Sequence, residues 1–104
     1  MDTEQAANAM DALGSPVRLE LYRLLIRAGE TGMTITRIQQ KTGMARSTLS
    51  HHLQRLIQGG LVSTEKDGAA RICRANYPAV NTLVSYLSDE CCVDEATGQT
   101  GEVA

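Results

Sequence analysis

The sequence has few aromatic residues: three Tyr and neither Phe nor Trp among 104 residues. Domains that bind single-stranded nucleic acid by stacking bases on a sheet need several rings on one face, so that class is excluded. No apolar run approaches the roughly 20 residues that cross a bilayer. The first residues, Met1-Asp2-Thr3-Glu4, lack the basic start of a secretory signal. We therefore expect a cytoplasmic protein without a membrane partner.

Catalytic motifs and a disulfide framework are also missing. The sequence has no Gly-rich phosphate loop, no Gly-x-Ser-x-Gly and no convergent set of His and carboxylate residues, so we do not expect an enzyme. Its three cysteines are Cys73, Cys91 and Cys92. They are too few for a disulfide-stabilised fold, and in a reducing compartment they remain thiols. We expect no permanently bound cofactor.

Charge is distributed unevenly, although the net charge is only −2. Residues 34–75 carry seven basic side chains against two acidic ones, whereas residues 76–104 have five acids and neither Lys nor Arg. A basic segment between acidic flanks is typical of a module that binds a polyanion through its middle part. The charge distribution alone is also compatible with ordinary solvent-exposed faces whose basic residues happen to cluster in this segment.

Apolar residues at helical spacing predict four helices in the first half of the chain. Ala6, Met10 and Leu13 form the expected apolar stripe of the first helix. Ser15 and Thr34 are favoured N-cap residues for the second and third helices, and glycines follow the predicted helix ends. The predicted helices cover residues 1–13, 16–28, 35–42 and 46–58.

The periodicity changes after residue 60. Two short extended runs, 61–65 and 71–77, flank a polar segment and predict a β-hairpin. A last helix, 78–91, would place Cys91 on the same apolar stripe as Leu87. The predicted order is α-α-α-α-β-β-α, a mainly α domain over residues 1–92. Residues 93–104 lack periodicity and are predicted to be a flexible acidic tail.

A short helix, a turn containing Gly43, a longer helix and a hairpin form a winged helix-turn-helix arrangement. The second helix of such a pair can lie in a DNA major groove, with apolar residues facing inward and polar residues outward. An ordinary amphipathic surface helix has the same periodicity, but it explains less well why Ser, Thr and His crowd the first turns. The predicted groove or phosphate contacts are Arg46, Ser47, Ser50, His51 and Arg55, with Arg71 of the wing on phosphate.

Three stretches resemble the ArsR/SmtB family of repressors: SPVRLELYRLL at 15–25, STLSHHLQRL at 47–56 and GGLV at 59–62. The resemblance covers about residues 8–90. It implies a homodimer built on the first and last helices. It also implies that the dimer binds double-stranded operator DNA when unliganded and releases it when an inducer binds. Without this resemblance, the residue patterns predict only a winged helix that binds DNA.

Two metal sites known in this family have no counterpart here. Residues 44–47 lack the Cys-x-Cys that many arsenic and cadmium sensors of the family carry at the start of the recognition helix. Residues 78–92 contain no His, so the zinc site of other members is absent too. His51 and His52 are adjacent on a helix and do not share a face, which favours DNA contact or packing over metal binding.

The adjacent pair Cys91-Cys92 is the remaining candidate sensor. Two thiols form a soft donor pair suited to trivalent arsenic, zinc or cadmium, and related arsenic repressors place a Cys-Cys pair near this end of the last helix. The acids around the pair are expected to raise the thiol pKa values. We predict arsenite or methylarsenite as the inducer. Redox or persulfide sensing, divalent-metal sensing and an interaction module without sensing stay open as alternatives.

Cys73 decides which arsenical fits the pair better. It lies on the predicted wing, and nothing in the sequence brings it near Cys91. Two protein sulfurs suit methylarsenite, which already has one As–C bond. Inorganic arsenite, better held by three sulfurs, would need Cys73, a thiol of the other subunit or a small-molecule thiol.

Overall fold

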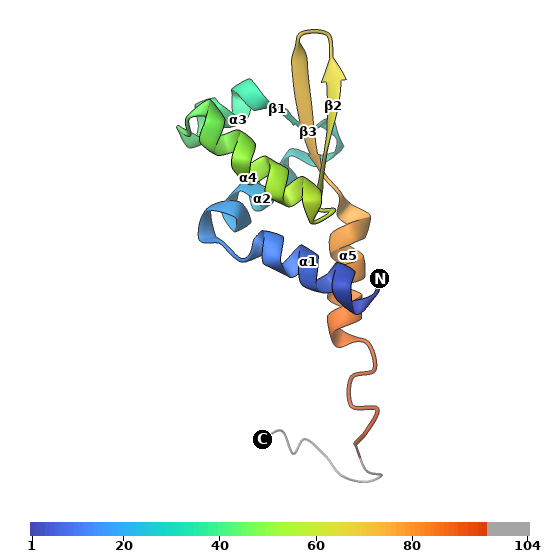
Figure 1. Ribbon diagram of the computed structural model, residues 1–104. Coiled ribbons are helices and arrows are strands. Elements are labelled where there is room, and N and C mark those ends of the chain that lie inside the picture. The colour runs from blue at the N-terminus through green and yellow to red at the C-terminus, as the bar shows by residue number, and fades with distance from the viewer. Residues whose placement is uncertain (96–104) are drawn as a thin grey trace.

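The computed structural model describes residues 1–95. Two helices, α1 and α2, precede the short strand β1, and α3 and α4 follow it (Figure 1). The hairpin of β2 and β3 then extends beyond α4, and α5 runs away from the base of the hairpin. The bounds are α1 Thr3–Leu13, α2 Pro16–Ala28, a 3-10 turn η1 Gly29–Thr31, β1 Met33–Thr34, α3 Ile35–Thr42, α4 Arg46–Gln58, β2 Val62–Asp67, β3 Ala70–Ala75 and α5 Tyr77–Ser88.

This is the predicted winged helix-turn-helix fold, and its helix starts follow from capping residues. The Ser15 hydroxyl accepts a hydrogen bond from the backbone N–H of Arg18, and the Thr34 hydroxyl accepts one from Arg37. Both predicted caps are confirmed. Each hydroxyl satisfies a backbone donor that the helix itself leaves unpaired.

The wing is a three-stranded antiparallel sheet with the strand order β1-β3-β2. The hairpin is longer than predicted, because Asp67 pairs with Ala70 and leaves a loop of only Gly68 and Ala69. The predicted polar segment 66–70 is therefore largely strand. β1, which was not predicted, pairs Met33 with Cys73 and ties the wing to the start of α3.

The core lies where α2, α3, α4 and the base of the wing meet. Leu21, Ile38 and Leu49 are fully buried there. α1 packs on this core through small side chains, Ala6, Ala9 and Ala12. The predicted stripe of α1 is thus partly wrong: Met10 is 43% exposed.

α5 ends earlier than predicted. Its last residue is Ser88, Asp89 has extended backbone angles, and Cys91 and Cys92 lie in a series of turns beyond the helix. Negative charges are unfavourable at a helix C-terminus, and Asp89 and Glu90 stand at this one. The expectation that Cys91 continues the apolar stripe is wrong. Of the predicted tail, residues 96–104 lie outside the described residues. Among helices of residues 1–95, none is long and apolar enough to cross a membrane.

Candidate functional site

The turn between α3 and α4 is held by side chain to backbone hydrogen bonds. The Thr42 hydroxyl donates to the Ile38 carbonyl over 2.8 Å and accepts from the Met44 N–H over 3.2 Å. Gly43 has left-handed backbone angles (φ 74°), which glycine adopts without a steric penalty. These contacts fix the angle at which α4 leaves α3.

α4 presents a polar outer face, as predicted. Leu49, Leu53 and Leu56 are buried against the core. Ala45 precedes the helix, and among the described residues no side chain caps its first turn. The unpaired N–H groups there are suited to a phosphate oxygen. The outer face exposes four of the predicted DNA contacts: Arg46, Ser47, Ser50 and His51.

The wing lies beside α4 and forms one wall of a cavity of ≈ 310 Å³ between them. Ser50 and Gln54 line it from α4, and Thr64 and Arg71 line it from the wing. Arg71 is exposed and donates to the Thr64 hydroxyl over 3.1 Å. Thr64 was not among the predicted site residues, since its position beside Arg71 depends on a hairpin register that the sequence did not give.

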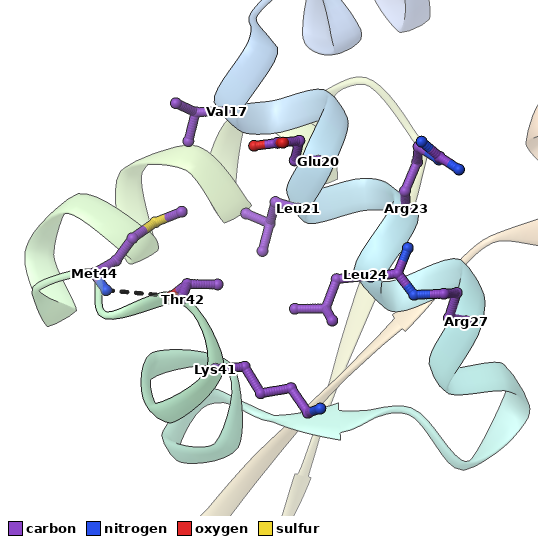
Figure 2. A pocket seen from close by; sticks show the side chains of 9 residues that line it. All are labelled: Val17, Glu20, Leu21, Arg23, Leu24, Arg27, Lys41, Thr42 and Met44. Carbon is purple, nitrogen blue, oxygen red and sulfur yellow. Dashed lines mark hydrogen bonds between the residues drawn. The ribbon is translucent and has the colours of Figure 1, made fainter.

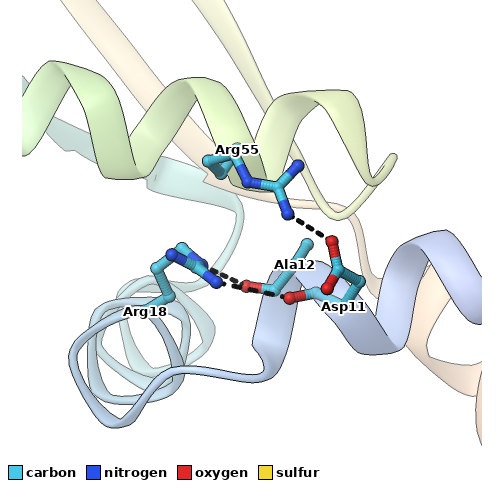
Figure 3. Close-up of polar contacts among 4 residues, drawn as sticks. All are labelled: Asp11, Ala12, Arg18 and Arg55. Carbon is cyan, nitrogen blue, oxygen red and sulfur yellow. Dashed lines mark hydrogen bonds and ion pairs between the residues drawn. The ribbon is translucent and has the colours of Figure 1, made fainter.

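Arg55 has a different environment from the other predicted contacts. Its guanidinium forms an ion pair with Asp11 of α1 (Figure 3). Nearby, Arg18 of α2 donates to the carbonyls of Ala12 and Asp11 over 2.7 and 3.3 Å. The structure therefore places Arg55 against α1, where it joins the first helix to the recognition helix.

His52 packs toward the core rather than outward. It is half-buried, and its Nδ1 has no hydrogen-bond partner among the described residues. Burial lowers its pKa, and the charges of Arg18 and His51 lower it further. In residues 1–95 no group of three or more His, Cys, Asp or Glu side chains is placed to hold a metal ion. This environment favours packing over metal binding for His52.

The two adjacent cysteines are exposed, and their Sγ atoms lie 3.1 Å apart. Both are thiols, because a disulfide requires about 2.05 Å. The hydrogen bond with Cys91 raises the pKa of Cys92, with a smaller effect of burial. A raised pKa was expected, but its main cause is the neighbouring thiol rather than the acids.

Cys73 is separated from this pair by its burial. It is fully buried in β3, and burial raises its pKa to about 11. Its strand neighbours are Met33 on β1 and Thr64 on β2. The structure thus brings Cys91 and Cys92 together and leaves Cys73 inside the core.

Comparisons with known proteins identify the family of this fold. A family model described as a helix-turn-helix domain matches residues 13–65. The nodulation protein NolR of Rhizobium meliloti is 32% identical, over 85% of this chain and 70% of that protein. The HTH-type transcriptional regulator YgaV of Escherichia coli is 29% identical, over 86% of this chain and 88% of its own length.

A homodimeric winged helix-turn-helix domain from Mycobacterium bovis, described as a possible ArsR-family regulator, has a TM-score of 0.68 at 28% identity. The similarity covers 89% of this chain and 86% of that one. This chain belongs to the ArsR family of winged helix-turn-helix transcriptional regulators.

Two further solved structures place this ArsR-family chain among diverse regulators. One, described as a possible transcriptional regulator for arsenical resistance, has a TM-score of 0.67 at 27% identity and covers 89% of this chain and 98% of its own. The other is the transcriptional repressor BigR from Xylella fastidiosa, with a TM-score of 0.63 at 27% identity and coverage of 85% and 88%.

Proposed function

We propose that this ArsR-family regulator is a homodimeric repressor that binds operator DNA when unliganded and is released by a trivalent arsenical, methylarsenite or arsenite, bound to Cys91 and Cys92. The observation that carries the proposal is the pair of exposed thiols 3.1 Å apart. The possible arsenical-resistance regulator among similar structures supports the choice of inducer.

The number of donors favours arsenic over zinc. Structural zinc sites have four protein ligands, and residues 1–95 offer no cluster of three. A three-coordinate arsenic needs fewer protein ligands, and the two exposed thiols are close enough to bind one atom together.

Methylarsenite carries two hydroxides that can be exchanged, and two protein sulfurs can replace both. Each thiol forms an As–S bond, its proton joins a hydroxide leaving arsenic, and two waters are released. The methyl group occupies the third position, and no oxidation occurs. Arsenite bound in the same way keeps one hydroxide, because Cys73 is buried and a third sulfur would have to come from another subunit or a small thiol.

Binding at the thiols would act on DNA through the dimer. The thiols follow α5, which exposes Val84 and Leu87 at 60% and 58%. These apolar side chains supply a surface through which two copies of α5 can pack, together with α1. An arsenical that closes a ring across Cys91 and Cys92 would change the turns next to this surface. The spacing of the two recognition helices would then no longer match the operator.

Redox or persulfide sensing is the second candidate, because the same short separation would let the two sulfurs join. A disulfide between them would need an external oxidant and would release two protons and two electrons. The raised pKa of Cys92 lowers its thiolate fraction and disfavours attack on an oxidant. Arsenical binding depends less on the thiolate.

Operator binding followed by fluorescence anisotropy tests both candidates. Parallel titrations use arsenite, methylarsenite, zinc, cadmium and a persulfide donor. We expect release by an arsenical, and Cys91→Ser or Cys92→Ser should bind DNA but no longer release it. Cys73→Ala is the matched control and should keep the methylarsenite response. Release by persulfide or zinc, with no response to either arsenical, would contradict the inducer while leaving the repressor intact.

A further inference from the structure

A cavity of ≈ 570 Å³ lies between α2 and the α3–α4 turn. Figure 2 shows Leu21 and Leu24 of α2 on one side and Met44 on the other, so the middle of the cavity is apolar. Val17, at one end, is 41% exposed. Small-molecule sites in proteins have about 300–1,000 Å³. This cavity has that size, and its apolar side chains lie among polar and charged ones.

Three cations line the same cavity. They are Arg23 and Arg27 of α2 and Lys41 of α3. The ion pairs within residues 1–95 are Arg55–Asp11 and Arg74–Glu65, so none of these three cations has an acidic partner there. Figure 2 shows Arg27 and Lys41 at one end of the cavity and Glu20 at the other. The site is therefore positive at one end and apolar in the middle.

We propose that this cavity binds a small organic carboxylate with an apolar body. The carboxylate would lie between the Arg27 guanidinium and the Lys41 ammonium, with charge-assisted hydrogen bonds from both. Its apolar body would cover Leu24 and Met44, which are half-buried, whereas Leu21 behind them is fully buried. The predicted DNA contacts and the thiol pair do not line the cavity, so the proposal is independent of the proposed arsenical function.

Such a ligand would bridge two elements that hold the recognition helix. Its contacts on one side are with α2, and on the other with Thr42 and Met44, whose hydrogen bonds fix the turn before α4. A ligand that joins both sides would stabilise one orientation of α4 relative to α2. We therefore expect the carboxylate to change operator affinity without reacting with any cysteine.

Amide chemical shifts of the full chain test the proposal, with 3-phenylpropanoate as the probe. We expect saturable shifts at residues 41–44 and along α2. The neutral 3-phenylpropanol should bind about three- to tenfold more weakly, because two exposed cations whose attraction solvent screens would be lost as partners. Arg27→Gln and Lys41→Gln should weaken binding similarly. Arg37→Gln, on the exposed face of α3 and outside the cavity, is the matched control and should bind within about twofold of the unchanged chain.

Several outcomes would overturn the proposal. They are the absence of saturable shifts at these amides, equal affinity for the acid and the alcohol, or an equal loss in Arg37→Gln. Inorganic phosphate that shifts the same amides and displaces the acid at similar concentration would assign the cavity to phosphate binding instead. The same spectra report whether each variant is folded, so a loss of binding through unfolding is recognised directly.

Discussion

The three cysteines of this chain have two different environments. Cys73 is fully buried in β3, whereas Cys91 and Cys92 are exposed beyond α5. Burial keeps Cys73 protonated, with a pKa of about 11. In the folded chain, alkylating reagents and arsenicals will reach only the adjacent pair among these three thiols.

The buried thiol of Cys73 is expected to make the free energy of unfolding depend on pH. Its pKa is raised in the folded chain, so the folded state holds the proton more tightly than the unfolded one. This contribution is complete below the unfolded pKa of 9.0 and is lost as the pH rises toward about 11. We expect up to roughly 3 kcal/mol of unfolding free energy to disappear over this range. Urea unfolding at several pH values measures it.

Cys73→Ala is the control for this dependence. The variant should be less stable at neutral pH because of the cavity it leaves, but its stability should fall less steeply between pH 9.0 and about 11. If the unfolding free energy fell equally steeply with pH in both chains, other groups and not this thiol would cause the loss.

The ion pair between Asp11 and Arg55 predicts a small coupling between α1 and α4. Its side chains are 68% and 33% exposed, so solvent screens their attraction. A double-mutant cycle with Asp11→Ala and Arg55→Ala should give a coupling of about 0.3–1 kcal/mol. High salt should reduce the coupling. Urea unfolding of the four chains measures it, and strictly additive effects would contradict the pair.

At the residue scale, the sequence predicted which side chains of α4 face outward, but not which residues of other elements they contact. Arg46 and Ser50 are exposed because the helical period places them opposite Leu49 and Leu53. Arg55 was predicted on that outer face too, but it meets Asp11, which is 44 positions away in the chain. A helical period cannot show what another element brings to a helix face.

The recognition helix and the wing are expected to play different parts on DNA. Arg46→Ala should cost about 1–3 kcal/mol on the operator and relax sequence specificity, because it would remove the predicted base contact. Arg71→Ala should weaken all duplexes similarly and flatten the salt dependence, because it would remove the predicted phosphate contact. Anisotropy at several salt concentrations separates the two. An Arg46→Ala affinity within about twofold of the original would assign base reading to another residue.

The contact between α1 and α4 depends on a glycine with no room for a side chain. A Cβ at Gly59 would lie 2.7 Å from the Cβ of Ala12. Its φ of −78° is ordinary, so Gly59→Ala would act through packing alone. We expect a loss of about 1–3 kcal/mol, seen as a lower melting temperature. Adding Ala12→Gly should recover part of it, and no recovery would show that the clash lies elsewhere.

At the element scale, two departures from the prediction have local causes. β1 contains only Met33 and Thr34, too few residues to show an alternating pattern, and it exists through pairing with β3. α5 was predicted to reach Cys91 because apolar spacing alone continued. The acids Asp89 and Glu90 already indicated an earlier end, since negative charge is unfavourable there. Unfavourable charge at the C-terminus of α5 therefore explains why the helix is shorter than its apolar periodicity predicts.

The whole molecule is expected to be a dimer. Val84 and Leu87 are exposed on α5 at 60% and 58%, on a helix that contributes Leu83 to the core. Val84→Glu with Leu87→Glu should give a folded monomer, because charges cannot be buried unpaired at the two-fold axis. Operator affinity should fall strongly, since one half-site remains. Light scattering gives the mass, and a monomeric mass for the unchanged chain at micromolar concentration would end the dimer proposal.

The early end of α5 bears on how such a regulator can change over evolutionary time. Cys91 and Cys92 lie in turns after Ser88, outside every helix and strand and away from the buried core. With the inducer bound at Cys91 and Cys92 as proposed, substitutions there would alter the chemical that is sensed without repacking the domain or changing its predicted DNA contacts. Inducer preference would then depend on a few residues outside the folded core. A lineage could acquire a new stimulus while inheriting its old target genes.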